Sequence, residues 1–187
     1  MIVGVTGFFC AGKDTFAEIL IHRGFVHVSL SDIIRDEIRR RDQEITIPRL
    51  TKVGNELRTH FGPGVLAERA LAIFPESGDA VVTSIRHSGE VEILRSRQDF
   101  RMVFVDAPIR VRYERSLARR RQGDPISFEE FRNAEQAQME SGDPNSQQLV
   151  KCRDMADLVI QNEGTQAELE TQIERALGSF KSRLKEV

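Results

Sequence analysis

The chain begins with Met-Ile-Val-Gly-Val-Thr-Gly-Phe-Phe-Cys-Ala-Gly-Lys-Asp-Thr-Phe, residues 1–16, and this stretch decides the fold. Residues 2–6 are rich in β-branched side chains, which is typical of a buried strand. Gly7 then opens the pattern Gly-x-x-x-x-Gly-Lys, and apolar residues follow at helical spacing from Phe16 onward. A glycine loop between a strand and a helix is the context in which this pattern binds phosphate.

The residue types of this phosphate-binding loop (P-loop) suit a phosphate cradle. Gly7 and Gly12 permit backbone conformations and close approaches that a Cβ would block. Successive N–H groups then point into one concavity beside the positive end of the following helix dipole. Lys13 adds a charge that reaches the β- and γ-phosphates of a nucleotide. We therefore expect ATP to bind through Gly7, Cys10, Ala11, Gly12, Lys13, Asp14 and Thr15.

One position departs from the usual loop pattern. The residue after the lysine is Asp14, where Ser or Thr normally serves Mg²⁺, and the hydroxyl follows at Thr15. A carboxylate also suits magnesium, directly or through a water, because hard cations take oxygen ligands. Both residues are therefore candidate metal ligands, and Thr15 is alternatively free to donate to an α-phosphate oxygen.

The composition shows no strong charge bias. The 187 residues suffice for one domain with a sizeable core, 30% of them are charged, and the formal net charge is −2. Cys10 and Cys152 are the two cysteines, and neither has a second Cys or His at metal-ligand spacing. No apolar run approaches a membrane span. We expect a single cytoplasmic domain over residues 1–187, a monomer or homodimer, that binds a small nucleotide and engages neither membranes nor nucleic acid.

Strands and helices alternate along the chain. Strands are expected at about 2–6, 25–30, 80–85, 101–106 and 158–161. After the P-loop helix, helices are expected at about 33–41, 49–60, 63–74, 88–98, 109–121 and 165–185. Such alternation specifies an α/β fold with a mostly parallel sheet that is covered on both faces. Two helical stretches, about 32–75 and 119–150, interrupt it and are expected to project over the carboxyl ends of the strands, where ligands bind.

Three groups of residues lie where phosphoryl chemistry would take place. Asp32 follows the second strand as a magnesium ligand or a base, or as a first-turn acid favoured by the helix dipole. Arg86 follows the third strand and is placed for bidentate phosphate binding, unless it is a solvated surface arginine. Arg115 and residues 119–121, followed by Asp124, form either a lid over the transferring phosphoryl group or a solvated helix end. The candidate catalytic residues are Lys13, Asp32, Arg86 and Arg120.

Weaker signals extend the expected acceptor site. Arg35 lies one helical turn after Asp32, and Asn55 and Arg58 belong to the first insertion. His60 and His87 are isolated histidines, which are expected to be surface groups and not bases. The expected acceptor contacts are Asp32, Arg35, Asn55, Arg58 and Arg86.

Taken together, these motifs resemble the P-loop kinases of the nucleoside monophosphate kinase group. The resemblance runs through the P-loop, Ser29-x-Ser31-Asp32-Ile33-Ile34-Arg35, Ile85-Arg86 and Arg119-Arg120-Arg121. The chain is more closely similar to archaeal adenylate-kinase-related and dephospho-CoA-kinase-like proteins, and to the P-loop half attached to some deoxycytidylate deaminases. Residues 12–15, 53–58, 61–67 and 156–165 carry this closer likeness.

The resemblance implies a P-loop NTPase three-layer sandwich with a five-stranded parallel sheet of order 2-3-1-4-5, an acceptor-binding insertion at 32–75 and a lid at 119–150. It also implies that residues 162–165 border the adenine of ATP, which adds Asn162 and Gly164, with Arg120 of the lid, to the ATP contacts. The chain departs from the family in two respects. The strand before Arg86 lacks the acid that many relatives have, and Glu135 and Gln138 stand in the lid helix where Asp and Glu are expected.

The favoured function is Mg-ATP-dependent phosphoryl transfer to a nucleoside or deoxynucleoside monophosphate. A phosphate acceptor is already ionised near neutral pH, which agrees with the lack of an obvious catalytic histidine. Two alternatives stay open. One is transfer to a ribose hydroxyl, as in dephospho-CoA kinases, for which Asp32 would have to act as the base. The other is a regulatory module that binds ATP without kinase turnover.

Overall fold

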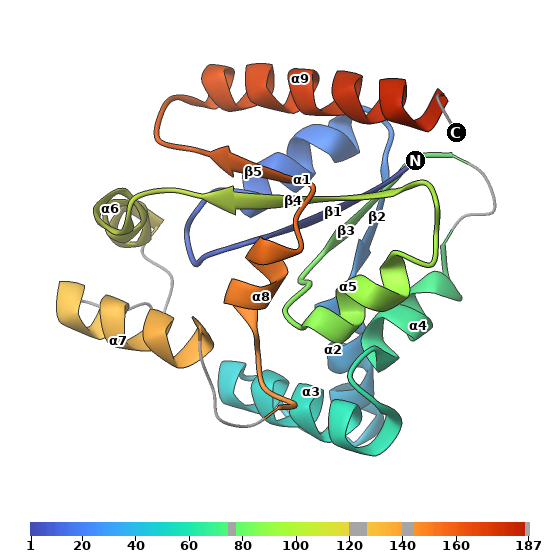
Figure 1. Ribbon diagram of the computed structural model, residues 1–187. Coiled ribbons are helices and arrows are strands. Elements are labelled where there is room, and N and C mark those ends of the chain that lie inside the picture. The colour runs from blue at the N-terminus through green and yellow to red at the C-terminus, as the bar shows by residue number, and fades with distance from the viewer. Residues whose placement is uncertain (75–77, 120–126, 140–143, 186–187) are drawn as a thin grey trace.

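The computed structural model describes residues 1–74, 78–119, 127–139 and 144–185. Within them, five strands form one sheet of order β2-β3-β1-β4-β5 (Figure 1). All neighbouring strands pair in parallel, so the expected α/β class and strand order are confirmed. The strands are β1 (Ile2–Gly7), β2 (Val26–Ser29), β3 (Ala80–Thr83), β4 (Phe100–Asp106) and β5 (Leu158–Gln161).

Helices cover both faces of the sheet, which gives a three-layer sandwich (Figure 1). On one face lie α1 (Lys13–His22) and α9 (Gln166–Lys185). On the other lie α2 (Leu30–Arg40), α3 (Ile47–Phe61), α4 (Val65–Leu71), α5 (Ser88–Leu94) and α8 (Leu149–Asp154). Beyond the carboxyl end of β4 stand α6 (Ile109–Arg119) and α7 (Phe128–Met139). No helix in the described ranges is long and apolar enough to cross a membrane.

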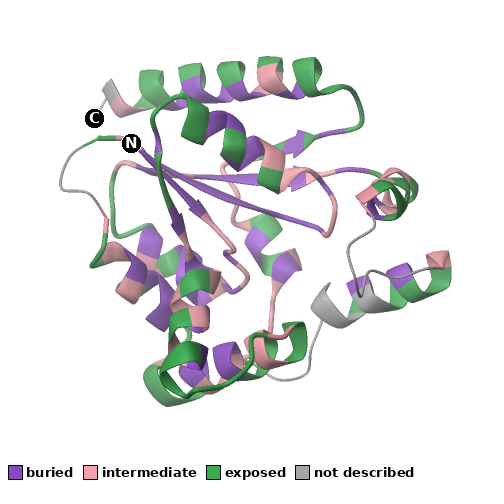
Figure 2. Cartoon of the chain, turned by 180° about the vertical axis from the view of Figure 1, so that it is seen from behind, coloured by how far each residue is buried: buried purple, intermediate pink, exposed green. Residues whose placement is uncertain are grey.

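Two apolar cores flank the sheet because side chains alternate between its faces along each strand. Val3 and Val5 of β1 face α1 and α9, where Phe16 and Ile173 pack against them. Ile2 faces the opposite core. That core includes Val82, Met102, Leu30, Ile38, Leu57, Leu66 and Val91. Figure 2 shows the central strands buried and the outward helix faces exposed, as a parallel sheet covered on both sides requires.

Several element ends differ from the expected ones. The helix expected from residue 33 begins at Leu30 with Ser29 as its N-cap, because β2 runs directly into it. The strand expected to reach residue 85 ends at Thr83, since Ser84 has a left-handed φ of 64°. The helices expected at 63–74 and 88–98 are shorter, Val65–Leu71 and Ser88–Leu94.

Helix α8 was not expected, because the surrounding sequence is polar. Leu149 and Cys152, three residues apart, are the apolar side chains that bury it against the sheet. Burial raises the pKa of the Cys152 thiol from 9.0 to about 12. The folded state therefore keeps a proton that the unfolded chain loses, and this group lowers stability progressively as the pH rises from about 9 towards 12.

Cys152 should accordingly resist alkylation in the native protein. In a Cys10→Ser variant we expect iodoacetamide to modify native Cys152 at least about 100-fold more slowly than the urea-unfolded chain at the same mildly alkaline pH. Mass spectrometry of time points measures both rates. Equal rates would contradict the packing of α8.

Candidate functional site

The loop between β1 and α1 follows a path that excludes larger residues at its two glycines. Gly12 has a φ of 99°, and a Cβ there would lie 2.2 Å from Asn162 Nδ2. At Gly7 a Cβ would lie 2.1 Å from the carbonyl oxygen of Val105. Cys10 also has a positive φ, 57°, which non-glycine residues rarely adopt outside constrained sites. The loop thus has the compact turn that a phosphate cradle needs.

Asn162 supports this loop from the end of β5 (Leu158–Gln161). Its Nδ2 donates to the Ala11 carbonyl at 2.8 Å, and its backbone N–H donates to the Asp106 carbonyl at 2.7 Å. The residue is 6% exposed. Gly164 lies in the exposed turn before α9, where a Cβ would lie 2.0 Å from Glu168 Oε2. The expected contacts of Asn162 and Gly164 with adenine stay predictions.

A cavity of about 340 Å³ opens beside the loop and extends to α2, α3 and the end of β3. One part of its wall carries the cations of Lys13, Arg35, Arg86 and Arg119. Another part is formed by the apolar side chains Ile34, Ile47 and Leu50, with Thr51 and Asn55 beside them. The volume falls within the range of small-molecule sites.

Burial destabilises the charged forms of two cations in this cavity. Burial, and secondarily the neighbouring Arg86 charge, lowers the pKa of Lys13 from 10.5 to about 8. Burial likewise lowers the pKa of Arg86 below its ordinary value. A bound anion would relieve both effects, so the electrostatics of the cavity favour a phosphate.

The cavity gathers the expected acceptor contacts other than Asp32, together with Lys13, Asp14 and Arg119, and leaves the other expected site residues outside its lining. Its wall includes Lys13, Asp14, Arg35, Asn55, Arg58 and Arg86. Asp32 does not line it: its carboxylate is 59% exposed and accepts from Arg35 Nη1 at 2.9 Å. Thr15 is half-buried on the first turn of α1 and also lies outside the lining. Arg120, like Arg121 and Asp124, lies outside the described residues.

Among the described residues, no group of three or more His, Cys, Asp and Glu side chains is arranged to hold a metal ion. Magnesium at a nucleotide site does not require one, since it commonly uses one or two carboxylates together with phosphate oxygens and waters. The oxygens of Asp14 and Thr15 beside the P-loop fit that donor set. Asp14, Thr15 and Asp32 remain predicted ligands.

Three arginines on one face of α6 contact the P-loop. Arg112 Nη1 donates to the Phe9 carbonyl at 3.5 Å, and Arg115 Nη1 donates to the Ala11 carbonyl at 3.5 Å. The Arg119 guanidinium lies over the Phe9 ring, 4.9 Å from its centroid. Arg115 and Arg119 were expected near the phosphates, whereas Arg112 was missed. Its spacing on the same helical face as Arg115 and Arg119 was the available signal.

Arg112 also ties α7 to this region through a buried ion pair. Its Nη1 donates to Glu135 Oε1, and its Nε donates to the Ala107 carbonyl at 2.6 Å. Both side chains of the pair are almost fully buried. Glu135, one of the two lid-helix positions that differ from the expected residues, therefore ties α7 to α6, beside the buried Phe131 ring. The side chain of the other, Gln138, is not among those described.

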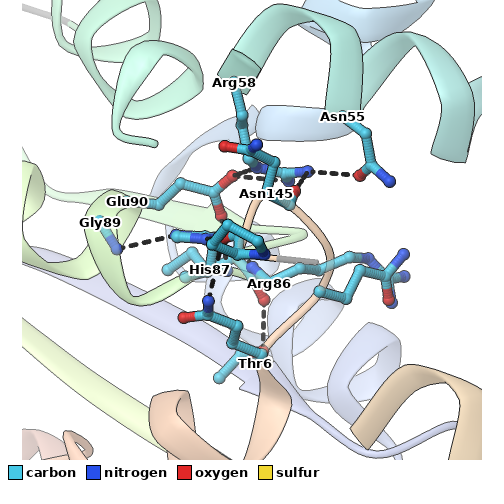
Figure 3. A network of polar contacts seen from close by, with 12 residues as sticks. Thr6, Asn55, Arg58, Arg86, His87, Gly89, Glu90 and Asn145 are labelled. Carbon is cyan, nitrogen blue, oxygen red and sulfur yellow. Dashed lines mark hydrogen bonds and ion pairs between the residues drawn. The ribbon is translucent and has the colours of Figure 1, made fainter. Parts of the chain in front are cut away.

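A second polar network lies at the carboxyl end of β3 (Figure 3). Glu90 accepts from Arg58 through Oε1 and from the backbone N–H groups of Arg86 and His87 through Oε2. His87 caps α5: its Nδ1 accepts from the Gly89 N–H at 3.0 Å. His87 is 4% exposed, so the expectation of a surface histidine was wrong, while His60 is exposed as expected.

Three serine hydroxyls meet where β2 and β3 end. Ser29 Oγ lies 2.9 Å from Ser31 Oγ and 3.2 Å from Ser84 Oγ. Arg35 Nη1 donates to Ser31 Oγ at 2.5 Å. Ser31 and Ser84 line the cavity and offer hydroxyl groups to a ligand. Ser84 was missed, because only the pairing of β2 with β3 brings it to the others.

Proteins with similar sequences align with nearly the whole length of this chain. A UPF0200 protein from Thermococcus kodakarensis is 31% identical over 191 residues, which covers 98% of this chain and 100% of that protein. The chain belongs to the UPF0200 family. A UPF0200 protein from Thermococcus gammatolerans is 32% identical, with 92% of each covered. No protein-family model matches the chain.

A third UPF0200 relative is longer. The UPF0200/UPF0201 protein from Archaeoglobus fulgidus is 30% identical over 182 residues, which covers 94% of this chain but 54% of that protein. The chain thus spans about half the length of that relative.

Solved structures that share the fold of this UPF0200 chain include small-molecule kinases. Shikimate kinase from Acinetobacter baumannii, solved with shikimate, has a TM-score of 0.62 at 17% sequence identity. The alignment covers 95% of this chain and 93% of the shikimate kinase chain. A gluconokinase from Sinorhizobium meliloti has a TM-score of 0.58 at 16% identity, with 98% and 94% covered. At these identities the likeness shows the fold, which is that of a P-loop kinase.

The Arg112–Glu135 pair generates a stability prediction. Glu135→Gln leaves a buried guanidinium without its counter-charge and should lower the free energy of unfolding by about 3–5 kcal/mol. The double variant Arg112→Met/Glu135→Leu removes both charges. It should lower the free energy of unfolding by less than Glu135→Gln does. Urea unfolding measures both, with exposed Glu114→Gln on α6 as control. A Glu135→Gln effect no larger than the control would show that the pair is not buried in solution.

Proposed function

We propose that this UPF0200 chain transfers the γ-phosphoryl group of ATP to a nucleoside or deoxynucleoside monophosphate in the presence of Mg²⁺. The observation that carries the proposal is the convergence of cations from separate elements on one cavity. Lys13 comes from the P-loop, Arg35 from α2 and Arg86 from the end of β3. Two negatively charged groups, a donor and an acceptor phosphate, are what such an arrangement accommodates.

The donor is assigned to the P-loop. The carbonyls of Phe8, Phe9 and Ala11 accept from Lys13, Arg112 and Asn162, and the Ala11 N–H donates to the Phe8 carbonyl at 3.2 Å. This compact loop leads into the N-terminus of α1, which favours phosphate oxygens. When bound, magnesium offsets negative charge on the phosphates. Arg120 and Arg121 come after the described end of α6. They are proposed to belong to a lid that residues 119–150 form over the nucleotide.

The acceptor is assigned to the insertion at residues 32–75 and the ends of β2 and β3. Arg86 and Arg35, with the hydroxyls of Ser31 and Ser84, would hold its phosphate. The apolar wall of Ile34, Ile47 and Leu50 suits a flat ring, and Thr51 and Asn55 suit the polar edge of a base. Ile47 is 71% exposed, as an apolar side chain that a ligand covers would be.

Transfer to a hydroxyl acceptor fits less well. It needs a base, and the expected one, Asp32, lies outside the cavity lining and pairs with Arg35. Asp14 supplies the carboxylate among the lining residues and lies on the donor side. A phosphate acceptor needs no base, so the geometry favours a monophosphate over dephospho-CoA.

An acceptor screen tests the proposal. The chain is incubated with Mg-ATP labelled at the γ-phosphate and with ribo- and deoxyribonucleoside monophosphates, dephospho-CoA, shikimate or gluconate. We expect label in at least one nucleoside diphosphate. Label in dephospho-CoA alone would establish a hydroxyl acceptor. ATP binding without transfer to any acceptor would instead indicate a regulatory module.

Lys13 gives the first test of the donor site. Lys13→Ala should lower kcat/KM on the order of 100-fold and weaken ATP binding, because it removes a charge aimed at the phosphates. Within the described ranges its Nζ makes one hydrogen bond, to the Phe8 carbonyl at 3.2 Å, so Tm should change little. Steady-state kinetics, ATP titration and thermal unfolding measure these effects, with exposed Lys52→Ala as control. Near-normal turnover of Lys13→Ala would show that the P-loop lysine takes no part in the mechanism.

Arg86 gives the matching test of the acceptor site. Arg86→Lys keeps the charge but loses the two-bond fork, so the acceptor KM should rise by the equivalent of about 1–3 kcal/mol. The ATP KM should change little, since Lys13 and the loop amides hold the donor. Initial rates with each substrate varied give both constants, and Arg97→Lys on the surface is the control. A loss of ATP affinity alone would place Arg86 at the donor site.

A further inference from the structure

Glu90 is a fully buried carboxylate at the centre of the polar network shown in Figure 3, with 0% of its surface exposed. Its Oε1 accepts from Arg58 Nε at 3.2 Å and from Arg58 Nη2 at 2.8 Å. Its Oε2 accepts from the backbone N–H of Arg86 at 2.8 Å and of His87 at 3.1 Å. One carboxylate thus joins α3 to the segment that carries Arg86.

Arg58 lines the cavity, but its donors are engaged within the protein. Besides the two bonds to Glu90, its Nη1 donates to Asn55 Oδ1 at 3.2 Å and to the Asn145 carbonyl at 3.4 Å. A guanidinium has five N–H groups, and these four bonds leave no two-bond fork for a phosphate. The contacts identify Arg58 as a group that holds Glu90 in place.

Arg86 is fixed at three points around this network. Its N–H is bound by Glu90, and its carbonyl accepts from the Gln148 N–H at 2.8 Å. Its Nη1 donates to Gln147 Oε1 at 3.2 Å. The side chain so held forms part of the cavity wall. Restricting an arginine in its binding position lowers the entropy lost when it binds a phosphate.

We propose that the Arg58–Glu90 pair is a positioning unit for Arg86: Arg58 orients the Glu90 carboxylate, which holds the backbone of Arg86 so that its guanidinium meets the acceptor phosphate. The inference rests on the proposed function, which places that phosphate at Arg86. Neither member of the pair contacts the reacting atoms. The unit sets acceptor affinity and leaves ATP affinity to the P-loop.

The chemistry of an amide at position 90 gives the proposal a distinctive signature. In Glu90→Gln the single remaining carbonyl oxygen is drawn to the Arg58 guanidinium, which places the amide N–H₂ group against the N–H of Arg86. The hydrogen bond to Arg86 is then lost. Adding Arg58→Met removes the competing charge, so the new amide carbonyl again accepts from Arg86 and His87. The double variant should therefore regain what the single variant loses.

Inorganic phosphate is the probe, titrated calorimetrically into protein whose P-loop is saturated with a non-hydrolysable ATP analogue. We expect Glu90→Gln to weaken phosphate binding about tenfold or more and to change the affinity for the analogue less than about twofold. Arg58→Met/Glu90→Gln should bind phosphate within about threefold of the unaltered chain. Glu92→Gln, exposed on the same helix, is the matched control and should match the unaltered chain.

Three results would overturn the proposal. An equal loss in the single and double variants would show that removing the Arg58 charge does not restore the contact with Arg86, so the two residues do not act as one unit. A parallel loss of phosphate affinity, analogue affinity and Tm would reduce Glu90 to a structural role. Absence of phosphate binding by the unaltered chain would show that there is no acceptor subsite to position. If the single variant fails to fold, the double variant, which buries no unpaired charge, still decides: loss of its phosphate binding refutes the proposal.

These outcomes are distinct from failure of the kinase proposal. If no monophosphate is phosphorylated in the acceptor screen while the phosphate titrations follow the expected pattern, the positioning role stands and the reaction assignment falls. If transfer occurs but Glu90→Gln leaves phosphate affinity unchanged, the kinase stands and the positioning role falls.

Discussion

Burial of cationic side chains at one end of a parallel sheet is the constraint on which the candidate site depends. Lys13 and Arg86 both line the cavity, partly withdrawn from water, and burial lowers the pKa of each. The P-loop contributes to holding such charges through its carbonyls. Phe8, Phe9 and Ala11 turn theirs towards Lys13, Arg112 and Asn162, respectively. The Ala11 N–H donates in turn to the Phe8 carbonyl at 3.2 Å, so these contacts close the loop into the compact turn that the proposed anion site requires.

The parallel sheet explains how these groups come together. Because the five strands are parallel, their carboxyl ends lie at the same end of the sheet. Residues that come after β1, β2, β3 and β5 contribute to the candidate site. The P-loop follows β1, Ser31 and Arg35 follow β2, Ser84 and Arg86 follow β3, and Asn162 follows β5. No single segment forms the site, and each strand needs only to end at the right residue.

This dependence on strand ends explains what the sequence could predict and what it could not. The P-loop, Arg86 and the strand order rest on local patterns, or on a resemblance carried by local motifs, so they could be assigned without coordinates. The Arg58–Glu90 bond joins residues 32 positions apart and has no periodic signature. Asp32 shows why a motif alone leaves a role open: it stands in a family-like motif, and the first turn of α2 directs its carboxylate to solvent and to Arg35. A motif fixes the backbone path, but the helical phase decides which of its side chains face the cavity.

The two buried ion pairs have a role that stability alone does not explain. Arg112–Glu135 joins α6 to α7 behind the P-loop, and Arg58–Glu90 joins α3 to the segment after β3. Apolar side chains of similar volume could hold the same helices together at comparable free energy, because burying charges costs most of what their attraction returns. What apolar side chains cannot do is direct hydrogen bonds to chosen backbone groups. Arg112 donates to the Ala107 and Phe9 carbonyls and Glu90 accepts from the Arg86 N–H, so each pair fixes the orientation of a segment that contributes to the cavity wall.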